Sequence, residues 1–274
     1  MAPLWEAEIL WIGLLFYVAG GSLGITGELL RLGPWTVRWV TLLLTLGLLL
    51  HALSLGLRWV RIGHGPFVTL FEILSSNLWS LTLALLLAYR ALTRLRGVLV
   101  IAMPPLFLMV AWILLTDPEA KPLPPTYETL WLYIHIGFGK IFLGFLLIAA
   151  AVGGIILSRA APSGRRLFAN LPQDDRLDEL AYRLMLVALA FDSLMLISGA
   201  IWAQEAWGRY WDWDPLEVWS LINWLWLVFA LHLRPAFALS PKGSAMVVVI
   251  AFLIAFLNFF GVPFLSKAPH QGIV

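Results

Sequence analysis

Segments of about twenty mostly apolar residues recur from one end of the chain to the other, and no other feature restricts the fold as strongly. A helix of about 20 such residues crosses the ~30 Å hydrocarbon core of a bilayer. Only 12% of the 274 residues are charged, whereas a soluble domain carries about a quarter. Because lipid offers no partner for backbone N–H and C=O groups, the spans must be helices. The sequence therefore predicts an all-α, polytopic integral membrane protein.

We expect about eight transmembrane helices in a single membrane domain that covers residues 1–274. The N-terminal "MAPLWEAE" has no basic region and no cleavage site, so the first span is predicted to be retained and not removed as a signal peptide. The expected spans are residues 8–27, 36–58, 68–92, 98–116, 130–158, 181–204, 215–235 and 244–266.

Arginine and lysine are concentrated in the loops that follow the first, third, fifth and seventh spans. The positive-inside rule assigns these loops to the cytoplasmic side. Both termini are then extracytoplasmic, and so is the tryptophan-rich connection at residues 202–219. The second loop, which should also be external, departs from the trend because it is flanked by Arg58 and Arg61.

The external segment 202–219 reads "WAQEAWGRYWDWDPLEVW" and holds five of the 15 tryptophans. One interpretation is an aromatic belt, because Trp favours both membrane interfaces. A belt scatters its aromatics over many helix ends, however, whereas this segment concentrates them beside carboxylates. Flat aromatic faces edged by polar groups suit a large planar ligand. Within the segment, Asp214 is a predicted helix N-cap and Pro215 a predicted first-turn residue.

Two histidines, His135 and His270, are predicted to reach the external face on either side of this segment. Neutral imidazole is a common axial ligand of heme iron, and two imidazoles make a six-coordinate site. The alternative is that each is simply a hydrated polar side chain at the interface. Taken together, they predict an external heme site.

Two further histidines lie within predicted spans, where an ionisable group is costly and indicates function. Counting residues from the cytoplasmic boundary places His51 and His232 at depths that differ by ~15 Å. Two ligands of one upright heme need nearly equal depth. We therefore expect any second ligand opposite His232 to come from another chain. For His51 the alternative is a hydrogen bond to a neighbouring backbone, and for His64, beside two glycines, an ordinary loop role.

Lys140 and Asp192 are predicted near the middle of the bilayer on consecutive antiparallel helices. An isolated charge there is expensive, so we expect the two to form an ion pair. A proton or ion pathway is the alternative. Glu72, near the external end of the third span, is a further carboxylate that could join the network of the tryptophan-rich segment.

The chain contains no cysteine, which excludes disulfides, thiolate metal ligands and cysteine nucleophiles. Any thiol chemistry must therefore use the thiols of a partner. The sequence has no phosphate-binding glycine loop and no zinc-protease motif. It also has no basic tract with interleaved aromatics, so nucleic acid is not an expected partner.

Three stretches resemble a known family. "WGRYWDWDPLEVW" (207–219) resembles the WWD signature WGxYWxWDPxExW of heme-handling proteins in the CcsA/ResC branch of system II cytochrome c biogenesis. "LINWLWLVFALHLR" (221–234) is similar to the family's next helix. "RWVRIGHGPFVTLFEILSSNLW" (58–79) looks like its third-span segment, with Thr69 and Phe71 departing from the usual Asn and Tyr. The resemblance runs from about residue 45 onward.

The resemblance implies a site for heme b on the external WWD segment, between one histidine before it and one after. His135 fits the first position, and His270 in "KAPHQG" fits the second by place, since the family usually reads close to LHSYG. An intramembrane heme would use His232 and a ligand on a CcsB-like partner, and His51 is a further candidate heme contact. The expected heme-contacting residues of the signature are Trp207, Gly208, Tyr210, Trp211, Trp213, Asp214, Glu217 and Trp219.

The resemblance further implies heme transport to the extracytoplasmic face of a lipid membrane, either the bacterial cytoplasmic membrane or a thylakoid. Heme would there be presented for attachment to the CxxCH thiols of apocytochrome c, with this chain as the CcsA-like half of a cytochrome c synthase. One alternative is a heme exporter or chaperone loader without ligation activity. Another is a proton- or quinol-coupled redox subunit. No side chain stands out as a general acid or base, so no catalytic residue is assigned.

Overall fold

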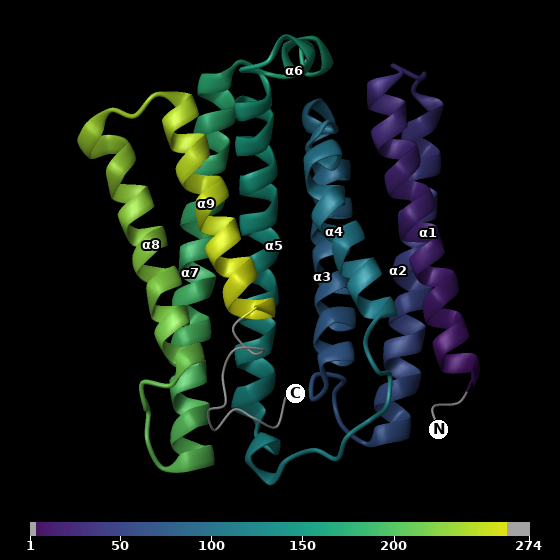
Figure 1. Ribbon diagram of the computed structural model, residues 1–274, viewed down its shortest axis with the longest axis vertical. Coiled ribbons are helices and arrows are strands. Elements are labelled where there is room, and N and C mark those ends of the chain that lie inside the picture. The colour runs from purple at the N-terminus through teal and green to yellow at the C-terminus, as the bar shows by residue number, and fades with distance from the viewer. Residues whose placement is uncertain (1–3, 262–274) are drawn as a thin grey trace. The chain divides into compact units, whose positions relative to one another are not determined.

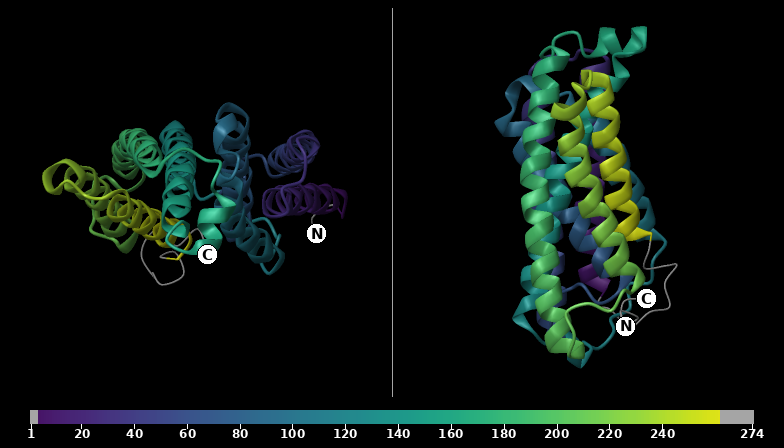
Figure 2. Two further views of the ribbon diagram at one scale, coloured as in Figure 1. Left: turned by 90° about the horizontal axis from the view of Figure 1, so that it is seen from above. Right: turned by 90° about the vertical axis from the view of Figure 1, so that its left-hand side faces the viewer.

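The computed structural model describes residues 4–261, and every regular element in that range is a helix (Figures 1 and 2). The chain divides into two compact units. Unit 1 comprises the chain up to Pro122 together with Arg159–Pro172, and unit 2 comprises Leu123–Ser158 together with the chain from Gln173 onward.

Unit 1 is built on two helix pairs, with α1 lying along α2 and α3 lying against α4, while α2 also contacts α3 (Figure 1). Leucines dominate its core, and Leu44, Leu74 and Leu99 are fully buried. Its elements are α1 (Leu4–Leu29), α2 (Trp35–Ile62), α3 (Leu70–Ala91), η1 (Thr93–Leu95), α4 (Val98–Leu114) and α6 (Pro162–Leu167).

Unit 2 is organised around α5, which lies along both α7 and α9, while α8 contacts α7 and α9 (Figure 2). Small residues let the neighbouring helices approach α5 closely, and the run Ala149–Ala151 is buried. Its elements are η2 (Pro125–Tyr127), α5 (Leu130–Ser158), α7 (Asp174–Trp207), α8 (Pro215–Phe237) and α9 (Pro241–Phe260).

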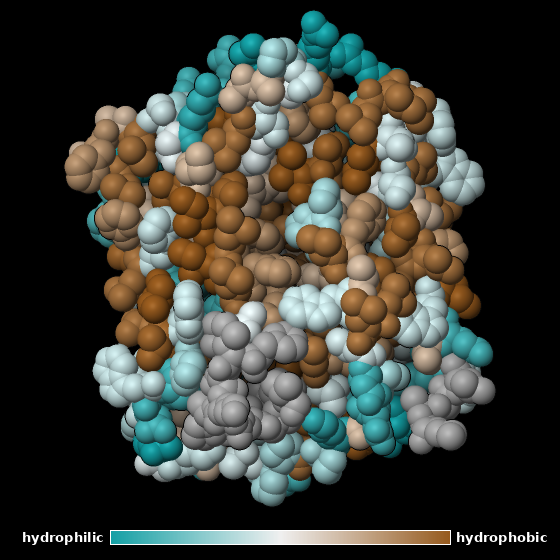
Figure 3. All heavy atoms as spheres, viewed as in Figure 1, coloured by the Kyte–Doolittle hydropathy of each residue, from teal (hydrophilic) through white to brown (hydrophobic). Residues whose placement is uncertain are grey.

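The all-helical membrane class is confirmed. Seven of the described helices are long and apolar enough to cross a membrane, and α4 is a shorter apolar helix of 17 residues. Each expected span corresponds to one of these eight helices, although α7 begins at Asp174, seven residues before the expected start. On the face seen in Figure 3, hydrophobic side chains predominate along the middle of the helices and hydrophilic ones are more frequent towards their ends. This is the surface that a bilayer requires.

The two arginines that depart from the loop trend are neutralised within unit 1. The Arg58 side chain is buried and donates to a Glu72 carboxylate oxygen at 2.8 Å and to Glu6 at 3.2 Å. It also donates to the Pro118 carbonyl at 2.9 Å. Arg61 donates to the second Glu6 oxygen at 2.7 Å. Two arginines are therefore paired with two glutamates, so Arg58 and Arg61 add no net positive charge to the second loop.

Glu72 also begins α3. Its carboxylate accepts hydrogen bonds from the Val68 and Thr69 backbone N–H groups at 2.8 and 3.2 Å, and its own N–H donates to the Thr69 hydroxyl. This reciprocal arrangement is a capping box, which satisfies N–H groups that the helix leaves unpaired. Glu72 thus belongs to the Arg58 network and to the start of α3.

Candidate functional site

The tryptophan-rich connection between α7 and α8 is held by its own carboxylates. Asp214 accepts from the Glu217 N–H at 3.0 Å, and the Glu217 carboxylate accepts from the Asp212 and Asp214 N–H groups at 2.7 and 3.4 Å. Pro215 is the first residue of α8. The predicted cap and first turn are confirmed. Asp214 and Glu217 therefore shape the loop backbone through hydrogen bonds.

Two backbone positions in this connection have positive φ. Gly208 ends α7 at φ 73° and donates to the Gln204 carbonyl at 3.0 Å, as glycine commonly does after a helix. Trp213 has φ 60°, a conformation that is strained for a bulky residue. Trp213 is 70% exposed. Backbone strain at a residue that exposes a large apolar ring makes this segment a candidate binding surface.

Further aromatic and charged residues lie close to Trp213 along the chain. Trp211 meets Trp213 edge-on, with ring centroids 5.8 Å apart. Tyr210 is exposed, and Arg209 forms an ion pair with Asp212. Trp219 lies one turn into α8 and is partly exposed. Aromatic faces, one cation and carboxylates thus line a single short segment.

A second aromatic group forms around Trp202, near the end of α7. Its ring centroid lies 5.1 Å from that of Trp207, 5.3 Å from that of Tyr127 and 5.9 Å from the His135 imidazole. The Trp202 indole N–H donates to the Thr126 carbonyl at 2.8 Å. Trp202 was not among the predicted site residues, although it begins the tryptophan-rich segment. It connects His135 to the signature residue Trp207.

The orientation of His135 is fixed from α7. Its Nδ1 lies 2.8 Å from the Met195 carbonyl oxygen. A carbonyl only accepts, so Nδ1 carries the proton and Nε2 is the nitrogen with the lone pair. Gly199 makes this position possible, because a Cβ there would lie 2.7 Å from Nδ1. Met195 and Gly199 were not predicted from the sequence, in which the small-residue run "SGA" at 198–200 was the available signal.

His270 lies outside the described residues. The structure therefore describes only one of the two predicted external histidines.

His232 lies on an exposed face of α8 near its C-terminal end. Its Nδ1 donates to the Val228 carbonyl one turn earlier, at 2.8 Å. Nε2 again carries the lone pair, in the arrangement typical of metal-ligating histidines. Two residues on, Arg234 donates to Asp178 and Glu179 at 3.0 Å each. These ion pairs fix the end of α8 that carries His232.

His51 and His64 are hydrogen-bonded within unit 1. His51 is fully buried, with Nδ1 3.3 Å from the Tyr17 hydroxyl and Nε2 2.8 Å from the Ser75 hydroxyl. His64 bonds the carbonyl oxygens of Gly65 and Lys121 at 3.0 and 3.3 Å. In this arrangement both ring nitrogens of each histidine are engaged by protein atoms.

The expected ion pair between Asp192 and Lys140 does not form in the described structure. Asp192 is fully buried and accepts instead from the Asn223 amide at 3.0 Å. This bond joins α7 to α8. Residue counting gave the two charged groups a similar depth, but it did not fix the direction in which each leaves its helix.

Comparison with known proteins identifies a family that matches most of the chain. Residues 39–270 match the family model described as "Cytochrome C assembly protein". The cytochrome c biogenesis protein CcsA of Prochlorococcus marinus strain MIT 9303 is 34% identical over 265 residues, covering 85% of this chain and 83% of the relative. CcsA of Guillardia theta is 31% identical, with 79% of each chain covered.

A solved structure shares the fold. The cytochrome c heme lyase CcmF superposes with a TM-score of 0.71 over 98% of this chain, at 19% identity. This chain spans about half the length of CcmF, since 48% of that chain is covered. The likeness is one of fold. The family match and the CcsA relatives show that the chain belongs to the cytochrome c assembly protein family, as a CcsA-type member.

Proposed function

We propose that this chain takes up heme within the membrane at His232 and presents heme b on the extracytoplasmic side between His135 and His270. The bound heme is then attached to the CxxCH thiols of apocytochrome c. A role in cytochrome c biogenesis follows from the family, and the individual steps are our proposal. The observation that carries it is the His135 imidazole, oriented by the Met195 carbonyl beside the Trp202–Trp207 pair.

The residue types of the candidate site suit a porphyrin. An axial imidazole needs its lone pair on the nitrogen that meets iron, and the Met195 hydrogen bond selects Nε2 for that role. A macrocycle needs flat apolar faces, which Trp207, Trp211 and Trp213 supply. Gly208, Asp214 and Glu217 hold the loop that carries these rings, and Tyr210 and Trp219 extend its aromatic surface.

The intramembrane site rests on the exposure of His232. An imidazole on the outer face of α8 can bind iron only together with a ligand that approaches from outside the helix. A second ligand on a CcsB-like partner meets this need. The Arg234 ion pairs with Asp178 and Glu179 stabilise the helix end at which that partner would dock.

Heme supplies two vinyl groups. Each thiol adds its sulfur to one vinyl carbon and its hydrogen to the other, so the atoms balance without a leaving group or an external oxidant. The thiols come from the client, since this chain has no cysteine. The chain contributes positioning, which raises the effective concentration of the reacting groups. The histidines also tune the iron as axial ligands.

The test is the absorbance spectrum of the protein purified with its CcsB-like partner. We expect a two-imidazole b-type heme, with the external heme lost in both His135→Ala and His270→Ala. His64→Ala is the control, because His64 bonds only loop carbonyls. If both external variants keep the parental spectrum, the external assignment is wrong.

For His232→Ala we expect assembly of a reporter cytochrome c to stop. Normal assembly in this variant would mean that His232 has only a structural role.

The same reporter cytochrome c distinguishes a synthase from a heme exporter without ligation activity. This chain and the CcsB-like partner alone should mature the reporter cytochrome c if the pair is a synthase. If mature cytochrome c appears only when a further assembly protein is added, the chain is a loader.

A further inference from the structure

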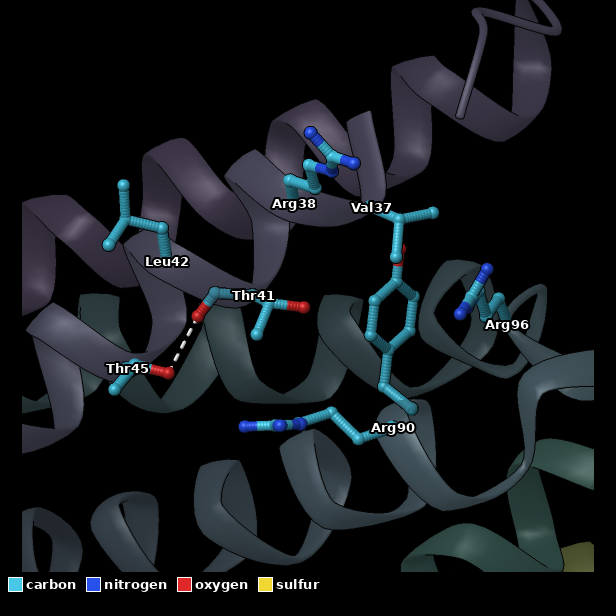
Figure 4. A pocket seen from close by; sticks show the side chains of 8 residues that line it. Val37, Arg38, Thr41, Leu42, Thr45, Arg90 and Arg96 are labelled. Carbon is cyan, nitrogen blue, oxygen red and sulfur yellow. Dashed lines mark hydrogen bonds between the residues drawn. The ribbon is translucent and has the colours of Figure 1, made fainter. Parts of the chain in front are cut away.

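Unit 1 contains a groove that the cytochrome c chemistry does not use. It has a volume of about 470 Å³ and lies between α2 and α3, at the end where α2 begins and α3 ends. Figure 4 shows three arginines around it, Arg38 from α2, Arg90 from α3 and Arg96 from the segment that follows. The arginine distribution of the loops predicts that this end faces the cytoplasm.

None of the three guanidinium groups has a carboxylate partner in the described part of the chain. Arg38, Arg90 and Arg96 take part in no ion pair and donate no hydrogen bond there, and the Nε of Arg96 is buried without an acceptor. The Arg96 guanidinium lies 5.7 Å from the Tyr89 ring centroid, which holds it at the groove. Glu28 of α1 attracts Arg96 only over a longer distance. Three cations against one distant carboxylate leave the groove electropositive.

The groove continues into an apolar surface. Along α2, Arg38, Leu42, Leu49 and Leu53 are separated by four, seven and four residues, so they share one face of the helix. The three leucines are 45, 62 and 49% exposed. From Leu42 to Leu53 the stripe extends over ~17 Å at 1.5 Å per residue, comparable with the ~15 Å hydrocarbon depth of one leaflet. Trp35 and Trp39, both exposed, flank the charged end, where tryptophan marks the membrane interface.

We propose that this groove binds the anionic headgroup of a phospholipid of the cytoplasmic leaflet, with an acyl chain along the leucine stripe. Basic pockets between transmembrane helices on this side of a membrane recognise such headgroups. Arginine suits phosphate because its planar fork donates two parallel hydrogen bonds. The long narrow stripe fits an acyl chain rather than a planar macrocycle, which would need a broad flat wall.

The experiment is native mass spectrometry of the full chain in detergent, titrated with phosphatidylglycerol, with phosphatidylcholine of the same acyl chains, or with hemin. We expect one phosphatidylglycerol to bind in preference to phosphatidylcholine. Each of Arg38→Gln, Arg90→Gln and Arg96→Gln should weaken its binding about fivefold. Arg94→Gln is the matched control, because Arg94 is an exposed arginine of the same loop that does not line the groove.

Three results would overturn the proposal. Equal binding of phosphatidylcholine would mean that the groove does not recognise the headgroup charge. An equal loss of binding in Arg94→Gln would mean that the lipid is attracted by the overall positive charge and not by the groove. Displacement of phosphatidylglycerol by hemin, with the same three arginines required, would make the groove a heme site. Arg96→Lys, which keeps the charge, should retain more binding than Arg96→Gln, and a thermal transition like that of the parent checks that each variant is folded.

Discussion

At the residue scale, the position of the His135 imidazole depends on the absence of a side chain at Gly199. Gly199 leaves the space in which Nδ1 reaches the Met195 carbonyl, and a Cβ there would lie 2.7 Å from Nδ1. Real Cβ atoms do not approach a ring nitrogen so closely, so the imidazole must move if Gly199 acquires a side chain.

We therefore expect Gly199→Ala to reduce the external heme although it changes no ligand. The displaced imidazole loses the Met195 hydrogen bond that assigns its tautomer, and metal binding falls by about 10–100-fold when such a second partner is removed. The measurement is heme content and spectrum with the CcsB-like partner present. Gly137→Ala is the control, because a Cβ at Gly137, two residues from His135, would meet nothing within 4 Å. Equal heme content in both variants would contradict the role of Gly199.

Tyr127 is a second residue whose substitution should change the stability of the protein in a predictable way. It packs edge-on against Trp202, is buried, and its hydroxyl has no hydrogen-bond partner in the described part of the chain. Burial raises the pKa of this phenol above its ordinary value. A buried unsatisfied hydroxyl costs free energy, which its removal recovers.

Tyr127→Phe should thus leave stability at pH 8 unchanged or increase it by up to about 1 kcal/mol. Above pH ~10 the unfolded phenol loses its proton before the folded one, so the parent protein loses stability as the pH rises. Tyr127→Phe lacks this contribution, so its stability should fall less between pH 8 and 10.5 than that of the parent. Thermal midpoints at the two pH values measure both effects. Tyr210→Phe, at an exposed phenol, is the comparison, and a parallel decline in parent and Tyr127→Phe would refute the expectation.

At the element scale, α3 and α8 begin in the same way. Each starts with a capping box in which a glutamate at the third helical position, Glu72 or Glu217, bonds back to the N-cap backbone. Both glutamates belong to stretches that resemble the family. Their environments differ, because only Glu72 also forms a buried ion pair, with Arg58.

The same substitution at these two positions should have unequal effects. Glutamine retains a capping box, so Glu217→Gln should cost less than about 1 kcal/mol. Glu72→Gln removes one of the two buried carboxylates around Arg58 and leaves Glu6 to neutralise both Arg58 and Arg61. Removal of one member of a buried pair costs up to about 3–5 kcal/mol. Thermal unfolding in detergent measures the difference. Similar shifts for both variants would show that the Arg58 contact contributes little.

The sequence predicted the helices better than their contacts. The length of the apolar segments and the charge of the loops were sufficient to predict eight helices. Asp214 and Pro215 were sufficient to predict where α8 begins. The partner of Asp192 could not be obtained in this way. Depth follows from counting residues, whereas the direction of a side chain depends on how each helix is rotated against its neighbours, which only packing decides.

The same limit applies to the candidate site. The aromatic signature was visible in the sequence, and so was His135. The support for His135 was not, because Met195 and Gly199 are ordinary residues in a span, about sixty positions away. A backbone carbonyl leaves no signal in the residue types. His51 lies in a span as expected, yet its buried bonds to Tyr17 and Ser75 depend on contacts with α1 and α3.

At the scale of the whole molecule, membrane orientation can be tested directly, because the chain has no cysteine. Asp212→Cys and Arg165→Cys each introduce one exposed thiol, in the tryptophan-rich connection and in α6. We expect an impermeant maleimide to label the first on intact cells and the second only after permeabilisation. The parent chain provides the background. The reverse pattern would invert the orientation and move the proposed external heme site to the cytoplasm.

The shortness of α4 has a consequence for the membrane itself. Its 17 residues rise only ~26 Å, about 4 Å less than the hydrocarbon core of a typical bilayer. Lipid accommodates such a hydrophobic mismatch by thinning around the short helix, at a fraction of a kcal/mol per Å. Unit 1 should therefore carry a local dimple in the bilayer beside α4. A thinner bilayer would relieve this distortion, so acyl-chain length becomes a variable to which the stability of unit 1 should respond.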